Sequence, residues 1–233
     1  NLYEKNQNEP LPIASITKLM TAIVAEENSD KSRPYRIIDS ILNNGGSSNT
    51  FIVQEEWSYD SLLHLTLIPS NNDAAETLAH TFGRENFINL MNAKAFELGL
   101  KDTFFTNETG LDEKDNVNTS NVTDLARLLL YTRYKHPEIL AITILDDYRA
   151  SDISKKRGLY ATSTNTLLSS STYPLHILGG KTGETPKAKK NLVLLTRDPH
   201  RNGYLLFIVL SSDNHFIDMR ELAKWTTESF DWK

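Results

Sequence analysis

The most regular hydrophobic pattern in the chain lies near its start. Apolar side chains recur there at the spacing of a helix face, at Ile16, Leu19, Met20, Ile23 and Val24. The pattern predicts a helix over about residues 14–27, and small or apolar side chains on the adjoining face make this helix buried nearly all round. Its one ionisable residue between Ile16 and Ala25 is Lys18. A buried ammonium without a partner is energetically costly, so Lys18 needs a reason to be there.

Helical patterns continue through the middle of the chain. They predict three helices, at about residues 59–67, 73–82 and 84–98, with Gly83 and Gly99 as helix stops. Thr123 or Asp124 is expected to cap a further helix that runs to about Tyr134, and Pro137 to start another short one. The segment 29–56 is polar and rich in turn residues, so no long element is expected in it.

In the last third of the chain the hydrophobic pattern changes from that of helices to that of strands. "KNLVLLTR" and "GYLLFIVLSS" are typical of β-strands, and "DPHRNG" between them of a turn. "HFIDMRELAKWTTESF" then predicts an amphipathic closing helix, with one stripe made by Met219, Leu222, Ala223, Thr226 and Phe230. Helices in the middle and an antiparallel sheet near the end, backed by the last helix, predict an α+β fold.

Composition narrows the class of protein without identifying it. At 233 residues and 39% hydrophobic, the chain can bury a full core in one large domain or two interleaved subdomains. The net charge of −5 lacks the basic stripe that nucleic acid requires, so no nucleic-acid partner is expected. The longest apolar run, "LLFIVL", is too short to span a bilayer. Cysteine is absent, which excludes disulfides and cysteine nucleophiles.

Lys18 has two interpretations. It can extend along the helix to solvent while Ser15 caps the helix. Alternatively, residues three apart on a helix lie about 5 to 6 Å apart at Cβ, which brings the lysine amine within reach of the Ser15 hydroxyl. A neutral lysine can then activate the serine as a nucleophile. Burial and a second cation, for which Lys181 is the candidate, lower the pKa of such a lysine.

Two other polar stretches allow both a structural and a functional reading. "PSNNDAAETLAH" fits ordinary turn and cap chemistry, but Ser70 could also relay a proton and Asn72 could bind a substrate amide. "GGKTGETP" suggests a phosphate loop at first sight. The required first glycine would fall at Leu175, however, and a strand rather than a helix follows, so a phosphate site is not expected.

Taken together, three motifs occur in a fixed order: Ser-x-x-Lys at Ser15, Ser-x-Asn at Ser70 and Lys-Thr-Gly at Lys181. Similar trios mark penicillin-binding proteins and class A β-lactamases. With "PIASITKLMTA", "TNETGLD", "TDLARLL" and "STNTLL", the chain resembles the D-alanyl-D-alanine carboxypeptidases of the S11 peptidase family over nearly its whole length. The resemblance implies a β-lactamase/transpeptidase-like fold, an antiparallel sheet flanked by helices with a mostly helical subdomain at roughly 28–150.

The resemblance also implies a role for each motif residue. Ser15 would attack the carbonyl between two D-alanines of a peptidoglycan stem peptide, Lys18 would take its proton, and Ser70 would assist proton transfer to the leaving amine. The substrate-binding residues would be Asn72 for the acyl part, Lys181 and Thr182 for the terminal carboxylate, and Gly183 and Glu184 on the same strand. The N–H groups of Ser15 and Glu184 would form the oxyanion hole. No cofactor or metal is implied, and β-lactam antibiotics would be inhibitors.

Three positions depart from the family's usual pattern. Asn71 stands where Gly is usual, and Lys187 and Lys189 stand where small residues and glycine are common, which puts substrate fit near that strand in question. By the same resemblance, residues 1–233 are expected to be a single catalytic domain that lacks the family's first strand and its membrane anchor. An extracytoplasmic location, in the periplasm or on the outer face of the cell membrane, is expected.

Rival functions differ in their sequence support. A β-lactamase is suggested by Glu108 to Asp112, "ETGLD", which imitates the loop that supplies a deacylating base but ends in Asp rather than Asn. A catalytically silent penicillin-binding protein is the second rival, and the intact motif residues argue against it. A metallohydrolase is disfavoured because the histidines, at positions 64, 80, 136, 176, 200 and 215, form no H-x-x-x-H pair.

Overall fold

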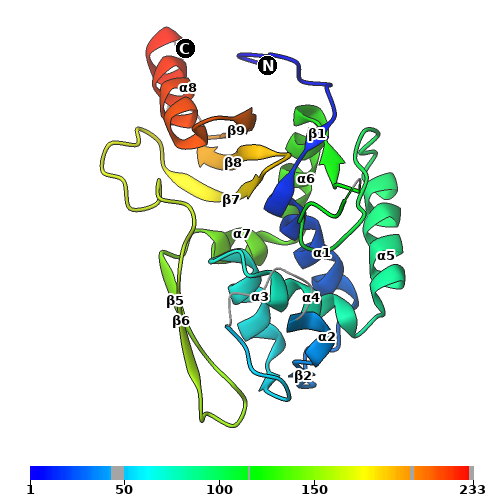
Figure 1. The fold of residues 1–233 in the computed structure, drawn as a ribbon. Helices are drawn as coiled ribbons and strands as arrows, with labels where there is room; N and C mark the ends of the chain where they lie inside the picture. The colour runs from blue at the N-terminus through cyan, green and yellow to red at the C-terminus, as the bar shows by residue number, and fades with distance from the viewer. Residues whose placement is uncertain (43–49, 115, 200–201, 231–233) are drawn as a thin grey trace.

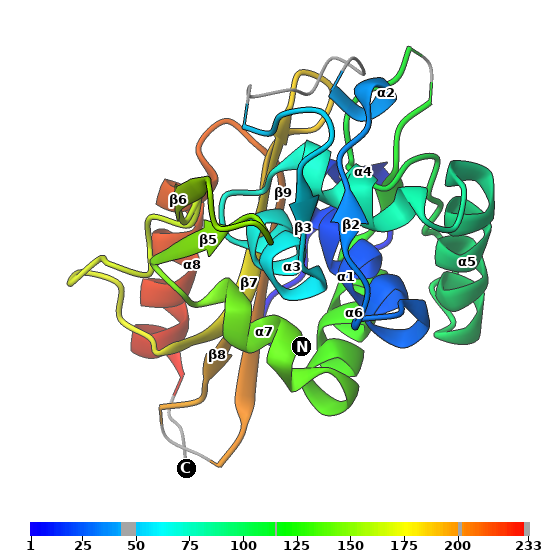
Figure 2. The same ribbon diagram turned by 90° about the horizontal axis from the view of Figure 1, so that it is seen from below.

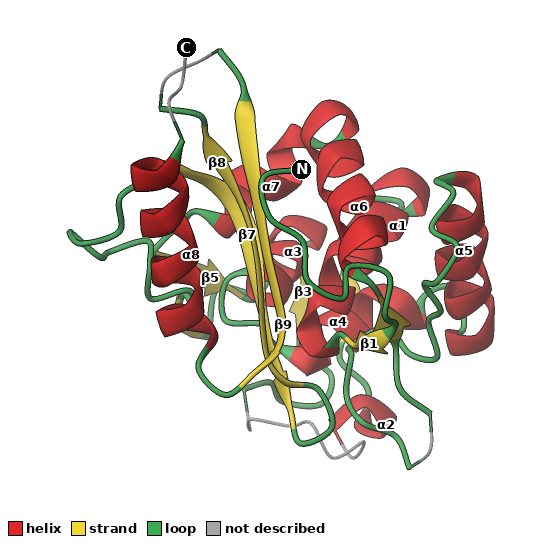
Figure 3. Ribbon diagram, turned by 90° about the horizontal axis from the view of Figure 1, so that it is seen from above, coloured by secondary structure: helices red, strands yellow, loops and turns green. Residues whose placement is uncertain are grey.

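The computed structural model describes residues 1–42, 50–114, 116–199 and 202–230. A three-stranded antiparallel sheet in the order β7-β8-β9 separates two layers of helices. Its strands are β7 (Ile177–Thr185), β8 (Lys189–Arg197) and β9 (Tyr204–Ser212). The closing helix α8 (His215–Ser229) covers one face, and all the other helices lie on the opposite side (Figures 2 and 3). The α+β class and the antiparallel sheet flanked by helices are confirmed.

The helical side is built from the segments whose periodicity predicted it. Its helices are α1 (Lys18–Asn28), α2 (Asp39–Leu42), α3 (Tyr59–Leu67), α4 (Asn72–His80), α5 (Arg84–Glu97), α6 (Val122–Lys135) and α7 (Pro137–Thr143). Residues 43–49, within the polar segment predicted to lack long elements, lie outside the described residues.

Strand β8 shows why the sheet needs helices on both faces. Val193 and Leu195 belong to the large core on the helical side, whereas Leu192 and Leu194 belong to a second core under α8. Successive side chains of a strand point to opposite faces, so a continuous apolar run such as "LVLL" is buried from both sides. The predicted stripe of α8 is confirmed at Met219, Ala223 and Thr226, all buried.

Several boundaries differ from the prediction for local reasons. The first helix begins as a 3₁₀ turn, Ala14–Thr17, before the α-helix starts at Lys18. The cap of α6 is neither Thr123 nor Asp124 but Asn121, whose side chain accepts a hydrogen bond from the Asp124 N–H at 2.8 Å. Gly83, expected as a stop, lies at the N-cap of α5 with φ of 78°.

Short strands complete the fold. The pairs are β1 (Leu11–Pro12) with β4 (Thr119–Ser120), β2 (Tyr35–Arg36) with β3 (Glu56–Trp57), and β5 (Asp147–Ser151) with β6 (Gly158–Thr162). The β5-β6 hairpin, which the periodicity did not predict, extends from the body at the lower left of Figure 1. The chain then returns toward β7, where the Thr164 hydroxyl lies 2.5 Å from the Thr182 hydroxyl.

Candidate active site

Ser15 lies in the 3₁₀ turn directly before α1. Ala14, the residue in front of it, has φ of 47°, a left-handed conformation that a residue with a Cβ adopts only when its surroundings impose it. Gly110 supplies part of that constraint, because a Cβ at Gly110 would lie 2.0 Å from the Ala14 carbonyl oxygen. Ser15 is thus held by close backbone packing rather than by the regular helix that its sequence pattern predicted.

Lys18 is fully buried, and its amine reaches three oxygen atoms. Nζ lies 2.9 Å from the Ser15 Oγ, 2.6 Å from the Asn72 Oδ1 and 2.7 Å from the Thr109 carbonyl oxygen. Burial lowers the pKa of Lys18 well below its ordinary value, and the positive charge of Lys181 lowers it further. Lys18 therefore does not extend to solvent, and the spacing argument that placed its amine on Ser15 is confirmed.

The second motif forms the turn between α3 and α4. Ser70 has φ of 61°, and Asn72 is the first residue of α4. Asn71, the departure from the family pattern, caps this helix: its side chain accepts a hydrogen bond from the Ala74 N–H at 2.8 Å. An asparagine N-cap stabilises a helix start, so Asn71 is accommodated without displacing its two motif neighbours.

Lys181 comes from β7 on the other side of the site. Its side chain is 2% exposed, and Nζ donates to the Ser70 Oγ at 2.7 Å and to the Thr182 carbonyl oxygen at 3.0 Å. Burial lowers the pKa of Lys181 to about 7. The Thr182 hydroxyl lies 2.5 Å from the hydroxyl of Thr164. The first lysine thus reaches Ser15 and the second reaches Ser70, with the two serines from different segments brought together between them.

Gly183 lets β7 approach the Ser15 backbone closely. A Cβ at Gly183 would lie 2.8 Å from the Ile13 carbonyl oxygen and 3.1 Å from the Ser15 nitrogen. Any side chain there would have to push the strand away from the Ser15 backbone. Glu184, the next residue, is exposed, and it lies opposite Lys190 in the pairing of β7 with β8. The oxyanion-hole role of its N–H stays a prediction.

Thr164 is the site residue that sequence reasoning did not assign. Besides the contact with Thr182, its backbone N–H donates to the Ile68 carbonyl oxygen at 3.2 Å, so it joins the Ser70 turn to β7. "STNTLL" contributed to the resemblance, but nothing in its pattern indicated where the loop would fold.

The loop after α5, residues 107–112, packs against α1 next to Lys18. Asn107 Oδ1 accepts from the Gly110 N–H at 2.6 Å, and the Glu108 carbonyl accepts from the Thr21 hydroxyl of α1 at 2.6 Å. The Glu108 side chain is 5% exposed and faces Arg84, with Nε 3.5 Å from Oε2. Asp112 accepts from the Thr185 hydroxyl at 2.9 Å, which ties the loop to the end of β7.

The two lysine departures lie at the turn between β7 and β8. The Lys187 N–H donates to Asp112 Oδ2 at 2.9 Å. Lys189 has φ of 54°, a left-handed conformation that glycine adopts at least cost, and its Nζ pairs with Asp213 at 2.9 Å. Both side chains belong to the turn, outside the cluster of the two catalytic-motif lysines.

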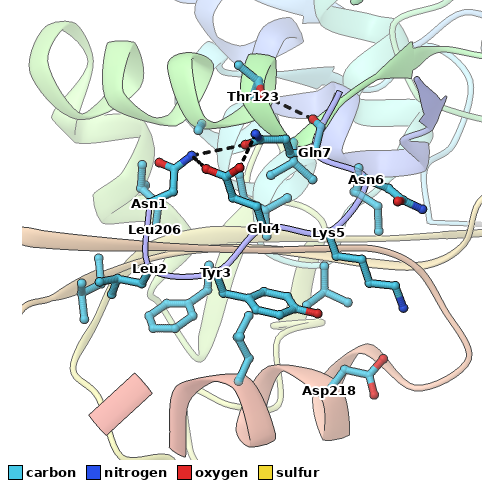
Figure 4. Close-up of a pocket in the computed structure, with 18 of the residues that line it drawn as sticks. Asn1, Leu2, Tyr3, Glu4, Lys5, Asn6, Gln7, Thr123, Leu206 and Asp218 are labelled. Carbon is cyan, nitrogen blue, oxygen red and sulfur yellow. Dashed lines mark hydrogen bonds between the residues drawn. The ribbon is translucent and has the colours of Figure 1, made fainter. Parts of the chain in front are cut away.

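A large groove lies elsewhere, along β9 at the opposite edge of the sheet from β7. Residues 1–9, α6 and α8 line it, and Figure 4 shows the N-terminal segment crossing it. None of the motif residues lines this groove. No helix in the described part of the chain combines the length and the apolar character needed to cross a membrane. Within that same part, no cluster of three His, Cys, Asp or Glu could hold a metal ion; His200 is outside it.

A serine within hydrogen-bonding distance of a buried lysine, beside a second serine and lysine, is the arrangement of a serine-type acyl-transfer hydrolase. A family model described as D-alanyl-D-alanine carboxypeptidase matches residues 1–214. The chain belongs to this family, the S11 peptidases.

Individual relatives agree with this assignment. The chain is 32% identical to a D-alanyl-D-alanine endopeptidase of Pseudomonas aeruginosa, over 96% of this chain and 72% of the relative. It is 35% identical to the D-alanyl-D-alanine carboxypeptidase DacF of Bacillus subtilis, over 81% of this chain and 48% of the relative. Penicillin-binding protein D2 of Listeria monocytogenes, solved in its ampicillin-bound form, superposes with a TM-score of 0.80 at 28% identity and covers 96% and 88% of the two chains.

Proposed function

We propose that this protein is a serine D-alanyl-D-alanine carboxypeptidase, with Ser15 as nucleophile and Lys18 as its base. It would remove the terminal D-alanine from peptidoglycan stem peptides through an acyl-enzyme, on the extracytoplasmic side of the membrane. The observation that carries the proposal is the fully buried Lys18 amine 2.9 Å from the Ser15 hydroxyl.

Burial and Lys181 lower the pKa of Lys18, and the partners of the amine orient its neutral form for the proposed proton transfer. A neutral amine has two N–H donors and one lone pair. The Asn72 Oδ1 and the Thr109 carbonyl can only accept, so they take the two N–H groups. The lone pair is then left for the third neighbour, the Ser15 hydroxyl, which can donate. Lys18 is thereby oriented to receive the proton as the Ser15 Oγ attacks the substrate carbonyl.

Departure of D-alanine needs a proton on its nitrogen. As the carbon–nitrogen bond breaks, the proton taken by Lys18 passes through the site to the leaving amine, with the Ser70 hydroxyl as relay. Ser70 accepts from Lys181 at 2.7 Å, so its own O–H is free to point toward the substrate. Lys181 and Thr182 bind the terminal carboxylate, and the N–H groups of Ser15 and Glu184 hold the carbonyl oxygen. Water then hydrolyses the acyl-enzyme.

A β-lactamase would need a carboxylate that activates water beside Ser15. The candidate, Glu108, is buried against Arg84, and its main chain faces α1 through Thr21. It is therefore assigned no proton transfer here. A penicilloyl adduct on Ser15 is expected to be long-lived, in keeping with the ampicillin-bound form of the Listeria relative.

The test combines a labelled penicillin with a peptide ending in D-Ala-D-Ala. Mass spectrometry of the digested adduct is expected to find the label on the peptide containing Ser15, and the parent protein is expected to release free D-alanine. Ser15→Ala should lose both. Label on any other serine overturns the assignment. Since some relatives are endopeptidases, a cross-linked stem peptide belongs in the same assay; its preferential cleavage would replace carboxypeptidase by endopeptidase activity.

A further inference from the structure

The side chain of Asn191 in β8 is fully buried, and both of its polar atoms are hydrogen-bonded. Nδ2 donates to the Pro12 carbonyl at 3.0 Å, and Oδ1 accepts from the Ser211 N–H at 2.8 Å. Asn191 therefore joins three segments: β1, which leads to the Ser15 turn, the central strand β8 and the last strand β9. No step of the proposed reaction uses this amide.

An irregularity of the sheet accompanies this side chain. The pairing of β8 with β9 shifts between Lys190 and Leu192, and Asn191 has no Cα partner in it. Ser211, on the facing strand, has φ of 54°. β-Bulges are common next to active sites, where they change the direction of a side chain. Here the Asn191 side chain, rather than the backbone, accepts from the Ser211 N–H, and its own NH₂ group is left for the segment before the nucleophile.

Asn191 lies on the face of the sheet that meets the Ser15 turn. It is opposite Gly183 in the pairing of β7 with β8, and such cross-strand partners share a face. On that face, a Cβ at Gly183 would lie 3.1 Å from the Ser15 nitrogen. Gly183 thus permits the close approach of the turn to the sheet. Asn191 supplies a hydrogen bond that holds it there, three residues before Ser15.

The segment in front of the nucleophile is held by two neighbouring bonds. The Pro12 carbonyl is tied to the sheet by Asn191, and the next N–H, that of Ile13, donates to the Asn118 carbonyl at 3.0 Å. Ala14 then takes its left-handed φ of 47°. Such a conformation persists only where the surroundings impose it. The direction of the N–H that follows Ala14 therefore depends on how this segment is held.

We propose that Asn191 is a positioning residue that fixes the Ser15 N–H against β7, and so sets the spacing of the two donors of the oxyanion hole. The inference rests on the proposed function, in which the N–H groups of Ser15 and Glu184 form that hole. Asn191 acts through the backbone at Pro12 and not on the substrate. Oxyanion donors work at about 2.7 to 3.1 Å from the oxyanion, so a small shift of the Ser15 backbone weakens stabilisation of the transition state.

The experiment compares a transition-state analogue with the substrate. A boronic acid that carries an acylamino group forms a tetrahedral adduct on a serine oxygen, and an oxygen of this adduct occupies the oxyanion hole. KM for a peptide ending in D-Ala-D-Ala depends mainly on the carboxylate and acyl contacts. Asn191→Leu keeps the approximate size of the side chain and removes both hydrogen bonds. Asn191→Ala removes them without the risk of a clash.

In each variant, the inhibition constant of the boronic acid is expected to rise, and kcat for D-alanine release to fall, by roughly 10- to 100-fold. This is less than the cost of deleting an oxyanion donor, about 10² to 10³-fold, because the Ser15 N–H is displaced rather than removed. KM should stay within about two-fold of the parent, since the lost interaction is made only in the transition state.

Asn92→Leu is the matched control. The Asn92 amide, on α5, donates to the Phe105 carbonyl at 2.8 Å and accepts from the Phe105 N–H at 2.9 Å. Its loss should lower the unfolding temperature but leave the boronic acid constant, kcat and KM unchanged.

An unchanged boronic acid constant in a folded Asn191 variant overturns the inference in favour of a structural role, whatever the unfolding temperature. Equal losses in KM and in the boronic acid constant overturn it as well, because they would report a general disruption of the site. If only one variant folds, its constants decide; if neither folds, Asn191 is structural and the inference is wrong. Failure of the parent itself to be acylated at Ser15 overturns the proposed function instead, so the two failures are distinguishable.

Discussion

Lys18 and Lys181 each place a lysine amine in the same site, one from α1 and the other from β7. The groups that surround the two amines differ. Lys18 is enclosed by three oxygen atoms from three segments of the chain: the Ser15 hydroxyl, the Asn72 side-chain carbonyl and the Thr109 main-chain carbonyl. Lys181 has two, the Ser70 hydroxyl and the carbonyl of its own neighbour Thr182. The charge of Lys181 adds to burial in lowering the pKa of Lys18, whereas burial alone accounts for the lowered pKa of Lys181.

The difference supports the proposed division of tasks, in which Lys18 is the base and Lys181 the cation. As a neutral amine, Lys18 would give both N–H groups to protein acceptors and direct its lone pair at the Ser15 hydroxyl. Lys181 has a pKa of about 7 in the free protein, so a substrate carboxylate can restore its charge on binding. In the proposed mechanism, the different neighbours of these two identical side chains suit them to separate tasks.

The strongest way to break the comparison is Lys18→Met. Methionine keeps the apolar stem but removes the amine, so acylation of Ser15 is expected to fall by at least about 10² to 10⁴-fold, the contribution typical of a general base. The measurement is the rate of labelling by penicillin at neutral pH. Lys18→Arg should fail as well, because a guanidinium stays protonated and cannot accept the Ser15 proton.

Circular dichroism and thermal unfolding supply the control for both variants. A variant that folds but is not acylated supports the role of Lys18 as the base. A Lys18→Met protein that is acylated at the parent rate would show that another group takes the proton, and the two lysines would no longer have different tasks.

Local patterns predicted the parts of the site that depend on sequence spacing. Ser15 and Lys18 are three residues apart, and their contact survives even though the turn is 3₁₀ at Ser15 and α-helical only from Lys18. The strands after "GGKTG" and the face of α8 followed from apolar periodicity in the same way. The presence of Ser70 and Lys181 in one site came from the family resemblance, whereas their direct hydrogen bond, between residues 111 apart in the sequence, was not predicted.

The missed features depend on contacts that no local pattern records. Thr164 reaches Thr182 only because the β5-β6 hairpin reverses the chain, and short exposed strands carry a weak period-two signal. Nothing in the sequence indicated that Glu76 would be buried, but α4 is enclosed and buries it. The cap at Asn121 was missed because three neighbouring polar residues can all cap, and backbone geometry decides among them.

A smaller effect is expected from Lys181→Met. Loss of one charged partner for the substrate carboxylate should lower kcat/KM for D-alanine release by roughly 10- to 100-fold, mostly through KM. In the parent, the protonated form of Lys181 binds the carboxylate, so kcat/KM should fall as the pH rises through about 7. The variant has no such group, and its alkaline limb should disappear.

A peptide ending in D-alaninamide tests whether this effect belongs to the carboxylate. The parent should lose efficiency toward the amide, whereas Lys181→Met should lose little more, because the contact is already gone. Equal losses in parent and variant would mean that Lys181 acts elsewhere in the reaction, and the contrast with Lys18 would weaken.

The smallest effect is expected at Thr164. Its substitution measures how much groups other than Lys181 contribute to binding of the substrate carboxylate. Thr164→Val keeps the shape and the backbone N–H bond to Ile68 but removes the hydroxyl 2.5 Å from Thr182. One neutral hydrogen bond is worth about 0.5 to 1.5 kcal/mol, so KM should rise roughly two- to ten-fold with kcat unchanged. Thr162→Val, on the exposed hairpin, is the matched control and should leave both constants unchanged. A fall in kcat instead would place Thr164 with Ser70 in proton transfer, on the Lys18 side of the chemistry.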